Sequence, residues 1–540
     1  MDFSSKKPVI TSIAMFLAVI LIIVTNSKVF GQATEINNWN NQLNLLDFQY
    51  QSLKYQPGGI TSAERNSIIA NKKGILSQAG LGSFNSFGSY VDTQLSIFQS
   101  DGKIILSRRG ESDELFSKYG MGRWFFENYQ SVNSARDNLA ILKEWGNSLD
   151  TIYVIKVPEG KLSLKGVASK QISGDGSEIR IGGSTQYWFL NPNKETNDWL
   201  LYAIYGPDHL KSYSTNITAA QQLGYAIVDD VRLHFEELRY NDLNYFKASS
   251  NQTNLNNQPR TRKSFNFWSR AYGFNVSSYN SNNKTSNLIH SSNAGIEKVI
   301  NKEKSSLYVG GFSGYAGLNS KVNTNNKDLV EYDNIKNNVS SIHGGIYAFY
   351  QQKNKGYYNP QFFADAIVSS GYLHFTNNVP GILNKGFKQR YNGANLITSA
   401  EAGLTSVFKH GFSIEPVIGI DFNKIMHENF NDKIFAPVSL AKGSSLRGDI
   451  GLKIRKTIIS KKNIKTLAYL KGCYSREFMG KNTINILDEQ GIDNQRGNYF
   501  GVGGGLNINI FKRFSVKAEM LKLLEKEKGF RGNFAFLFNL

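Results

Sequence analysis

A strict alternation of apolar and polar side chains through the C-terminal half most constrains how this chain can fold. In the segment 445–455, Leu446, Ile450 and Leu452 alternate with Arg447 and Asp449. The same alternation recurs over 411–423, 499–510, 514–520 and 530–540. Because successive side chains of a strand point to opposite faces, each segment predicts a strand with one apolar and one polar face.

Alternation alone fits both a soluble β-sandwich and a membrane β-barrel, and three observations favour the barrel. The strands are predicted to be about ten residues long, and roughly 9–11 residues cross a bilayer. The last alternating segment runs to Leu540, so its strand must pair rather than fray. Tyrosines cluster near the predicted strand ends, as in aromatic girdles: Tyr272, Tyr308, Tyr315, Tyr347, Tyr350, Tyr357, Tyr358 and Tyr372.

The spacing of these segments predicts an all-β barrel of about 12 antiparallel strands over residues 265–540. Tight turns such as 409–411 alternate with longer polar loops such as 320–338. Pro416 lies inside a predicted strand, where proline is expected only at a bulge or an unpaired position. The glycines Gly501, Gly503 and Gly505 occupy the polar face and would leave room inside the barrel.

The composition narrows the class of protein further. A mean hydropathy of −0.35 argues against a bundle of transmembrane helices, but strands that are only half apolar remain compatible with it. One cysteine, Cys473, excludes a disulfide framework and a cysteine-based zinc site. Lysine and arginine number 62 against 43 acidic residues, a balance that fits anionic partners or simply a lysine-rich composition.

Part of this positive charge falls on the face predicted to line the barrel: Arg447, Lys453, Arg455, Lys517 and Arg531. Nucleic acid is therefore not among the predicted partners. No metal site is predicted either, and no cofactor, because the sequence contains neither metal-ligand spacing nor a phosphate-binding loop.

The first 33 residues predict a signal peptide. Lys6 and Lys7 precede an apolar run over 9–24, which is shorter than the roughly 20 residues that span a bilayer. Small residues follow, and cleavage is expected after Gly31 or Ala33. An uncleaved N-terminal anchor is the alternative. Either way the remaining chain is expected to be exported.

Several short motifs resemble the translocator barrel of classical autotransporters, the type V secretion proteins. They are Phe267-Trp268-Ser269-Arg270-Ala271-Tyr272-Gly273, the segment 307–315, Gly344-Gly345-Ile346-Tyr347, Ile414-Glu415-Pro416 and the segment 529–536. The resemblance implies a twelve-stranded outer-membrane barrel with a helix threaded through its lumen and a passenger displayed outside. It also implies insertion by the outer-membrane assembly machinery, which reads an aromatic residue at the end of the last strand. Here Leu540 is last, with Phe538 two residues before it.

A helix followed by a linker is predicted over 218–264, immediately before the barrel. Thr218 and Gln221 form a capping-box pattern, and Leu223, Ile227, Val231, Phe235 and Leu238 recur at helical spacing. The apolar stripe favours packing of 218–239 on the passenger, whereas a polar lumen would suit the stretch 240–263. Which of the two segments fills the barrel stays open at this point.

The predicted passenger, residues 34–217, reads as a short α+β domain without solenoid repeats. Helical spacing covers 61–79 and 131–146, and buried strands are predicted at 151–157 and 199–204. The segments 118–125, 153–157, 166–168 and 182–187, together with Arg136, resemble NAD glycohydrolases of the tuberculosis-necrotizing-toxin type. The resemblance implies that Arg123 and Arg136 bind the pyrophosphate of NAD and that Gln186 acts in catalysis by orienting the ribose or the attacking water.

The sequence thus predicts an exported outer-membrane protein that displays a short passenger at the cell surface for contact with a host or another surface. Its predicted partners are outer-membrane lipid, the assembly machinery and a host surface molecule. The alternative is that the passenger is an NAD-consuming enzyme, with NAD as its substrate. Whether the chain is an enzyme is left open.

Overall fold

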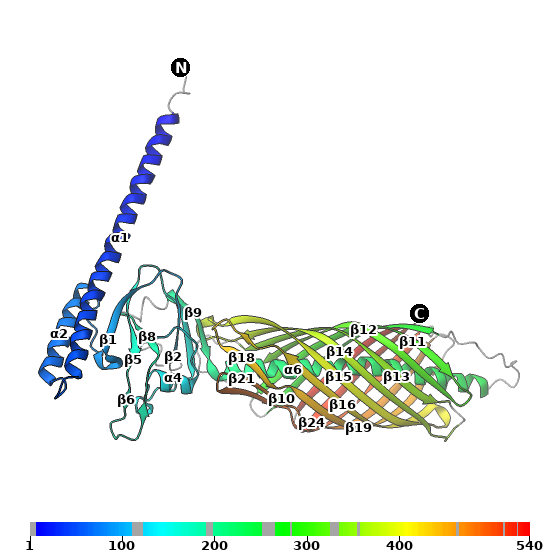
Figure 1. The fold of residues 1–540 in the computed structure, drawn as a ribbon. Helices are drawn as coiled ribbons and strands as arrows, with labels where there is room; N and C mark the ends of the chain where they lie inside the picture. Colours follow the sequence, from blue (N-terminus) through cyan, green and yellow to red (C-terminus); the bar gives the residue numbers. More distant parts are fainter. Residues whose placement is uncertain are drawn as a thin grey trace, which may run out of the picture. The chain divides into compact units, whose positions relative to one another are not determined.

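The computed structural model describes residues 7–110, 123–190, 198–250, 265–280, 283–323, 334–353, 357–460, 464–510, 514–525 and 528–539. The chain divides into two units, Met1–Tyr202 and Ala203–Leu540. Figure 1 shows a helical and mixed-sheet region in blue and cyan and a barrel in green to red.

Twelve strands of the described residues close into an antiparallel barrel. They are β10 (Phe265–Asn280), β11 (Asn283–Asn301), β12 (Ser305–Val322), β13 (Ile335–Gln352), β14 (Gln361–Val379), β15 (Phe387–Val407), β16 (Phe412–His427), β19 (Ser444–Ser460), β20 (Ile464–Glu477), β23 (Gly497–Ile510), β24 (Phe514–Glu525) and β25 (Lys528–Asn539). The first and last strands pair, with Tyr272 opposite Ala535. The predicted barrel is therefore confirmed. The strands contain 12 to 21 residues, so the predicted length of about ten was too short.

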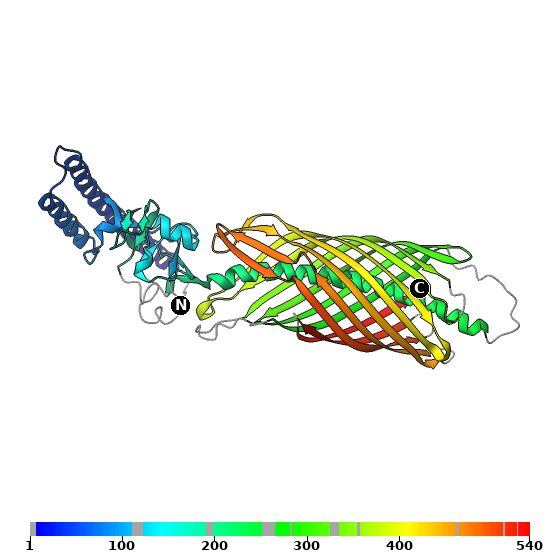
Figure 2. The ribbon, with the colours of Figure 1, turned by 90° about the horizontal axis from the view of Figure 1, so that it is seen from below.

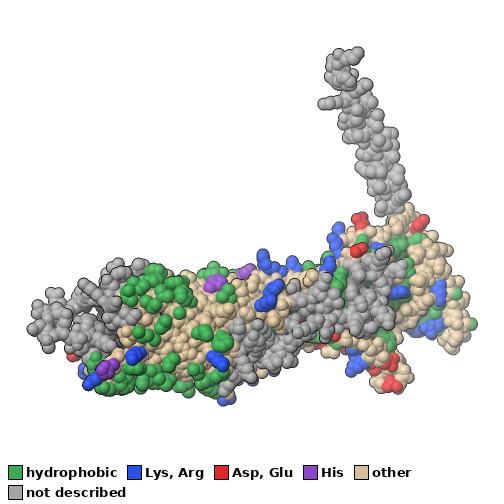
Figure 3. All heavy atoms as spheres, turned by 180° about the vertical axis from the view of Figure 1, so that it is seen from behind, with side chains coloured by type: hydrophobic (Ala, Val, Ile, Leu, Met, Phe, Trp, Pro, Cys, Tyr) green, Lys and Arg blue, Asp and Glu red, His purple; other side chains and the backbone are tan. Residues whose placement is uncertain are grey.

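The alternation that predicted these strands separates the two surfaces of the barrel wall. Ile418, Ile450 and Phe534 are exposed on the outside, whereas Asp421 and Arg455 are buried within. On the face shown in Figure 3, hydrophobic side chains gather over the barrel strands. An apolar exterior and a polar interior are the arrangement that suits a barrel surrounded by lipid.

The predicted aromatic girdle is only partly right, because several of its tyrosines point inward. Tyr315 and Tyr372 are exposed, but Tyr272, Tyr308 and Tyr347 are buried. Glycines on neighbouring strands make room for such inward rings. A Cβ on Gly310 would lie 2.5 Å from Cζ of Tyr347. The position of a tyrosine along its own strand therefore does not show whether it belongs to a girdle or points into the barrel. The second arrangement depends on a glycine in the neighbouring strand.

Pro416 interrupts one hydrogen-bonded ladder, as proline in a strand requires. Between β15 and β16 the pairing stops after Gly403↔Val417 and resumes at Ser406↔Ile414. On its other side Pro416 remains paired with Leu452. The missing N–H thus coincides with a gap in the ladder.

A second, four-stranded sheet extends two of the barrel connections. It consists of β17 (Phe430–Asn431), β18 (Pro437–Lys442), β21 (Lys481–Ile486) and β22 (Glu489–Asn494), in that order. β17 and β18 lie between β16 and β19, and β21 and β22 lie between β20 and β23. Some connections are tight, as predicted: η4 (Lys409–Gly411) turns through His410 at φ 59°. Of the predicted loop 320–338, residues 324–333 lie outside the described ranges.

The N-terminal unit is an α+β domain with two small sheets. One sheet has the order β1 (Tyr90–Gln99), β5 (Leu162–Ala168), β8 (Thr185–Trp188), β3 (Trp124–Phe125). The other has the order β2 (Ile105–Gly110), β4 (Thr151–Lys156), β9 (Leu200–Tyr205). A ribbon of β6 (Gln171–Ile172) and β7 (Ile179–Arg180) and the helices α4 (Val132–Asn138), η1 (Phe87–Ser89) and η2 (Lys143–Trp145) complete it. The buried strand predicted at 151–157 is present, whereas the helix predicted over 131–146 is divided into α4 and η2.

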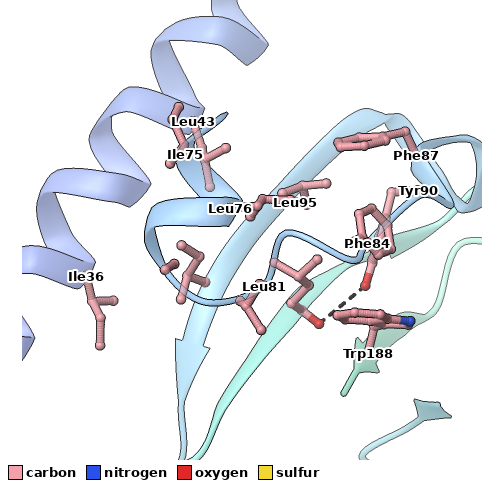
Figure 4. Packing of buried hydrophobic residues seen from close by; sticks show 13 residues of the cluster. Ile36, Leu43, Ile75, Leu76, Leu81, Phe84, Phe87, Tyr90, Leu95 and Trp188 are labelled. Atoms are coloured by element: carbon pink, nitrogen blue, oxygen red, sulfur yellow. Dashed lines mark hydrogen bonds between the residues drawn. The ribbon is translucent and has the colours of Figure 1, made fainter. Parts of the chain in front are cut away.

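Two helices cover the first sheet. α1 (Lys7–Lys54) packs against α2 (Ser62–Gln78). Thr61 is the N-cap of α2 and forms a capping box with Glu64. Between the helices and the sheet lies a buried apolar cluster, drawn in Figure 4: Ile36, Leu43, Ile75, Leu76, Ala79, Leu81, Phe84, Phe87, Tyr90, Leu95, Ile97, Leu164 and Trp188. The Tyr90 hydroxyl donates to the Leu164 carbonyl at 3.3 Å, which satisfies the polar end of a buried ring.

The predicted cleavage sites, after Gly31 or Ala33, fall inside the helical backbone of α1, and processing there stays a prediction. Residues 1–6 of the predicted signal peptide lie outside the described ranges. Of the helices in the described part of the chain, none has the length and apolarity of a membrane-spanning helix.

A buried ion pair ties α1 to α2. The Lys72 ammonium is inaccessible to solvent and contacts the Asp47 carboxylate. Burial raises the pKa of Asp47 and lowers that of Lys72, so for each group desolvation outweighs attraction to its partner. The free-energy penalty of burying each charge is offset by the opposite charge of the other, so removal of either residue is expected to destabilise the fold.

We predict that Asp47→Ala destabilises the α1–α2 hairpin by about 3 kcal/mol, because it removes a counter-ion from a buried ammonium. Hydrogen exchange by mass spectrometry on the full chain should show exchange in α2 faster by on the order of a hundredfold. Lys73→Ala, at the exposed neighbouring position, is the matched control. Equal exchange in the two variants would contradict the prediction.

Candidate functional site: the helix-filled barrel lumen

The helix α6 (Gly206–Ser250) runs lengthwise through the barrel, as Figure 2 shows. It begins at Gly206 rather than at the predicted Thr218. Its side chains bond to inward-facing groups of the barrel strands from Ser212, beside Asn377, to Arg239, beside Glu415. Of the two segments that the sequence left open, the helix predicted over 218–239 therefore fills the lumen, and the packing on the passenger that its apolar stripe favoured is not found. Residues 251–264 of the predicted linker lie outside the described ranges.

The apolar stripe of α6 is compatible with the lumen because part of the lumen wall is itself apolar. Phe235 stacks on Phe349 of β13, with ring centres 4.9 Å apart and planes at 4°. Its ring also meets that of Tyr347 edge-on at 5.1 Å. An apolar helical face has a partner in the lumen wherever such aromatic rings point inward.

Arg232 of α6 lies among three carboxylates of the barrel wall. Its guanidinium is 3.2 Å from Asp421, 3.6 Å from Asp365 and 3.8 Å from Glu401. It also donates to the Ser399 hydroxyl at 2.6 Å. The side chains of Asp365 and Asp421 are fully buried, so Arg232 is the helix's counter-charge to a cluster that water does not solvate.

Glu236, one turn further along α6, has the opposite sign and faces basic groups. Lys517 lies 3.1 Å away and Arg455 3.9 Å away, and Lys453 also contacts the Glu236 carboxylate. These bases were predicted from alternation alone to line the lumen. The helix therefore presents an arginine to the acidic part of the wall and a glutamate to the basic part.

Two adjacent aspartates of α6 bind arginines from the first and last strands. Asp229 pairs with Arg531 of β25 at 2.6 Å, and Asp230 pairs with Arg270 of β10 at 3.0 Å. Arg531 also donates to the Tyr272 hydroxyl at 3.2 Å. Since β10 and β25 are paired at the point where the barrel closes, these two bonds hold the helix at the closure.

His234 joins the helix to the motif that opens the barrel. Its ring stacks on Trp268 with centres 4.6 Å apart, and its Nε2 lies 3.1 Å from the Glu297 carboxylate. Tyr347 donates to the same carboxylate at 2.9 Å and accepts from Nε1 of Trp268 at 2.8 Å. The aromatic residues of this motif therefore serve the interior of the barrel.

The residues of the predicted capping box bind the second sheet. Thr218 Oγ1 donates to Asp493 at 2.5 Å, and Gln221 Nε2 donates to Asn482 at 2.9 Å. Because the helix begins at Gly206, Thr218 and Gln221 lie in its interior and do not cap its start. Their side chains bind the neighbouring strands instead. Nearer the helix start, His209 Nε2 lies 2.6 Å from Asp432.

The glycine that admits a close approach lies on the helix and not on the strands predicted to provide it. A Cβ on Gly224 would lie 2.2 Å from Nδ2 of Asn423, which donates to the Gln221 carbonyl at 3.0 Å. At Gly503 and Gly505 a Cβ would instead meet carbonyl oxygens of β24. At these two positions the glycine-rich strand makes room for its neighbouring strand.

The three residues predicted to bind or act on NAD lie in the N-terminal unit. The Gln186 side chain is buried and donates to the Ser89 carbonyl at 2.7 Å. Arg136 donates to the Asn147 carbonyl at 2.7 Å, and Arg123 is exposed, 5.9 Å from the Trp188 ring. Residues 118–122, which carry part of the resemblance, lie outside the described ranges. Their predicted roles stay predictions.

The lumen is thus an enclosed network of complementary charges between one helix and twelve strands. Among the described residues, no group of three or more His, Cys, Asp or Glu side chains is placed to hold a metal ion. The arrangement is suited to holding a helix inside a barrel.

A family model, the autotransporter beta-domain, matches residues 267–520. The C-terminal unit is an autotransporter β-domain. It lies in the outer membrane, and the region that precedes it is a passenger at the cell surface. The family and fold expected from the sequence motifs are confirmed.

Solved translocators are similar to the β-domain at low identity. The transport unit of the autotransporter AIDA-I from Escherichia coli is 16% identical, with a TM-score of 0.45, over 61% of this chain and 97% of that one. The beta domain of the Bordetella autotransporter BrkA is 14% identical, with a TM-score of 0.39, over 51% and 99%. The translocator domain of NalP from Neisseria meningitidis is 12% identical, with a TM-score of 0.38, over 58% and 98%. No curated protein matches the chain.

We predict that Arg232→Met destabilises the folded β-domain by about 3–5 kcal/mol, because it removes a positive charge from a cluster of buried carboxylates. Asp421 keeps its ion pair with Arg447 at 2.9 Å, so the loss falls mainly on Asp365. The loss should shrink as the pH falls, since protonation of those carboxylates removes their mutual repulsion. Heat-induced unfolding, followed by the gel mobility of the detergent-solubilised chain at pH 7.5 and pH 4.5, measures both effects.

The matched control is Arg476→Met, at an exposed arginine of β20. It should change the unfolding temperature little at either pH. A pH-independent loss in the Arg232 variant, or an equal loss in the control, would show that Arg232 does not neutralise the cluster.

Proposed function

We propose that the displayed passenger is a contact module, which binds molecules of a host or of another surface while the β-domain anchors it. The observation that supports this most is that the N-terminal unit has a hydrophobic core of its own, built from α1, α2 and the β1-β5-β8-β3 sheet. A part of a chain with its own core presents a fixed surface to the outside wherever it is carried.

The polar groups singled out for NAD chemistry add a second line of support. The Gln186 amide is committed to a backbone carbonyl inside the unit, and one Arg136 nitrogen is likewise committed. A side chain that already satisfies a buried carbonyl gives up that bond before it can serve a substrate. We therefore favour binding over NAD consumption, with neither NAD nor another cofactor required.

Two finer steps belong to the same proposal. The first is that the outer-membrane assembly machinery inserts the β-domain. The second is that a host surface molecule is the partner of the passenger. Both rest on the family of the β-domain and on the position that it gives to the passenger.

Display is testable by cysteine labelling, because Cys473 is the single cysteine of the chain. In a Cys473→Ser background, Ser67→Cys on the exposed side of α2 should react with a membrane-impermeant maleimide on intact cells. Ser399→Cys, at a buried lumen position, is the control and should stay unlabelled until the protein is unfolded. Labelling of Ser67→Cys only after cell lysis would contradict display at the surface.

The enzymatic alternative is tested by incubating the purified full chain with NAD. We expect no NAD loss beyond that of protein-free detergent micelles. Arg123→Ala and Gln186→Ala are the informative variants, since both positions carry the resemblance. NAD hydrolysis by the wild-type chain that falls in both variants would replace the binding proposal with an enzyme.

A further inference from the structure

The N-terminal unit contains a solvent-open cavity of about 490 Å³ on the face of the β1-β5-β8-β3 sheet away from the helices. It is lined from β1 by Phe98 and Gln99, from β5 by Lys165 and from β8 by Tyr187, with Glu127 beside them. Its volume lies within the range of small-molecule sites, roughly 300–1,000 Å³. Tyr187 ends the segment 182–187 that carries part of the NAD resemblance, but none of the lining residues is among the three to which that resemblance gives a role.

One carboxylate in the cavity is held in a fixed position. Glu127 accepts a hydrogen bond from the Tyr187 hydroxyl and lies 3.4 Å from the Lys165 ammonium. The bond from Tyr187 lowers the pKa of Glu127, which therefore remains a charged acceptor at neutral pH. Both contacts use Oε1, and no described residue binds Oε2. The cavity thus offers an oriented acceptor with one open oxygen.

A donor and an apolar platform lie beside this acceptor. The Lys165 ammonium stands 5.2 Å from the centre of the Tyr187 ring and 5.8 Å from that of Phe98. A cation over rings at an exposed site gains only about 0.5–1 kcal/mol, so a ligand can displace it cheaply. The half-buried Phe98 ring packs edge-on against Tyr187 at 5.3 Å, which fixes its orientation. Displaced from the ring, the ammonium becomes a donor at the rim.

The charges around the cavity cancel. Asp101 and Glu127 are acidic, and Lys103 and Lys165 are basic. A phosphate-bearing ligand would need a surplus of positive charge, and a cationic ligand would need a surplus of negative charge. The lining instead fits an uncharged molecule with one apolar face and an edge of hydroxyl groups, which can donate to Glu127 and accept from Lys165.

We infer that this cavity binds a neutral saccharide, with one face of the sugar on Phe98 and its hydroxyls between Glu127 and Lys165. Tyr187 is a positioning residue, because it orients the carboxylate from beneath. The inference rests on the proposed contact function and names the class of molecule that the passenger contacts.

Saturation-transfer NMR on the purified full chain tests this, in a zwitterionic detergent without sugar groups. The probes are lactose, cellobiose and N,N′-diacetylchitobiose. We expect saturable transfer to the protons of at least one of them. Glu127→Gln should weaken its binding by about tenfold, the worth of a hydrogen bond to a charged group. Phe98→Ala should abolish transfer to one face of the sugar.

The matched control is Glu178→Gln, in a second cavity of the same unit that contains no aromatic side chain. It should leave saccharide binding unchanged, and circular dichroism verifies that each variant is folded. Absence of transfer to all three sugars would overturn the inference. Equal binding by wild type and Glu127→Gln, or preference for adenosine diphosphate or spermidine over the sugars, would overturn it as well.

The two proposals fail separately. Sugar binding by the purified chain, together with Ser67→Cys that is unlabelled on intact cells, would overturn display and leave the saccharide site standing. Surface labelling without sugar binding would overturn the saccharide site and leave display standing.

Discussion

The interior of the β-domain is governed by one requirement: charges withdrawn from water need partners of opposite sign. Twelve strands with an apolar outer face necessarily direct their polar faces inward, where α6 takes up space that water would otherwise fill. Asp365 and Asp421 are fully buried there, and Arg232 is their counter-charge from the helix. Glu236 is the counter-charge from the helix to the lysines Lys517 and Lys453. Helix and barrel are therefore complementary in charge along the helix.

This complementarity accounts for why the position of the helix is specified. Apolar contacts oppose a shift of one turn through lost packing, and ion pairs of alternating sign add an electrostatic penalty to it. Moving α6 by one turn would place Arg232 where Glu236 faces Lys517, and like charges would meet. Gly224 adds a steric constraint, since a Cβ at this position would lie 2.2 Å from Nδ2 of Asn423. Charge order and one close contact thus set the register of the helix in the barrel.

The strands were predictable from the sequence because their pattern is local, whereas the contacts that side chains make inside the lumen were not. Period-two alternation identified both faces of the wall and the basic residues inside, such as Arg447 and Lys453, without any knowledge of pairing. Whether Tyr347 belongs to a girdle or to the interior depends on Gly310, a residue of the neighbouring strand. Whether α6 packs outside or inside depends on Phe349, more than a hundred residues further along the chain. Such choices depend on pairing, which no window of sequence contains.

In the passenger, too, the sequence motif and the folded structure indicate different candidate residues. Motif spacing predicted a catalytic role for Gln186, whose side chain the fold directs into the unit to bind the Ser89 carbonyl. The next residue, Tyr187, points to the opposite face because alternation in β8 reverses direction, and there it meets Glu127, Lys165 and Phe98 from separate elements. A one-residue step along a strand therefore separates a structural amide from a hydroxyl that orients an open carboxylate. In a sheet that is covered on one face by helices, the side chains that can reach a ligand from solvent are those on the opposite face.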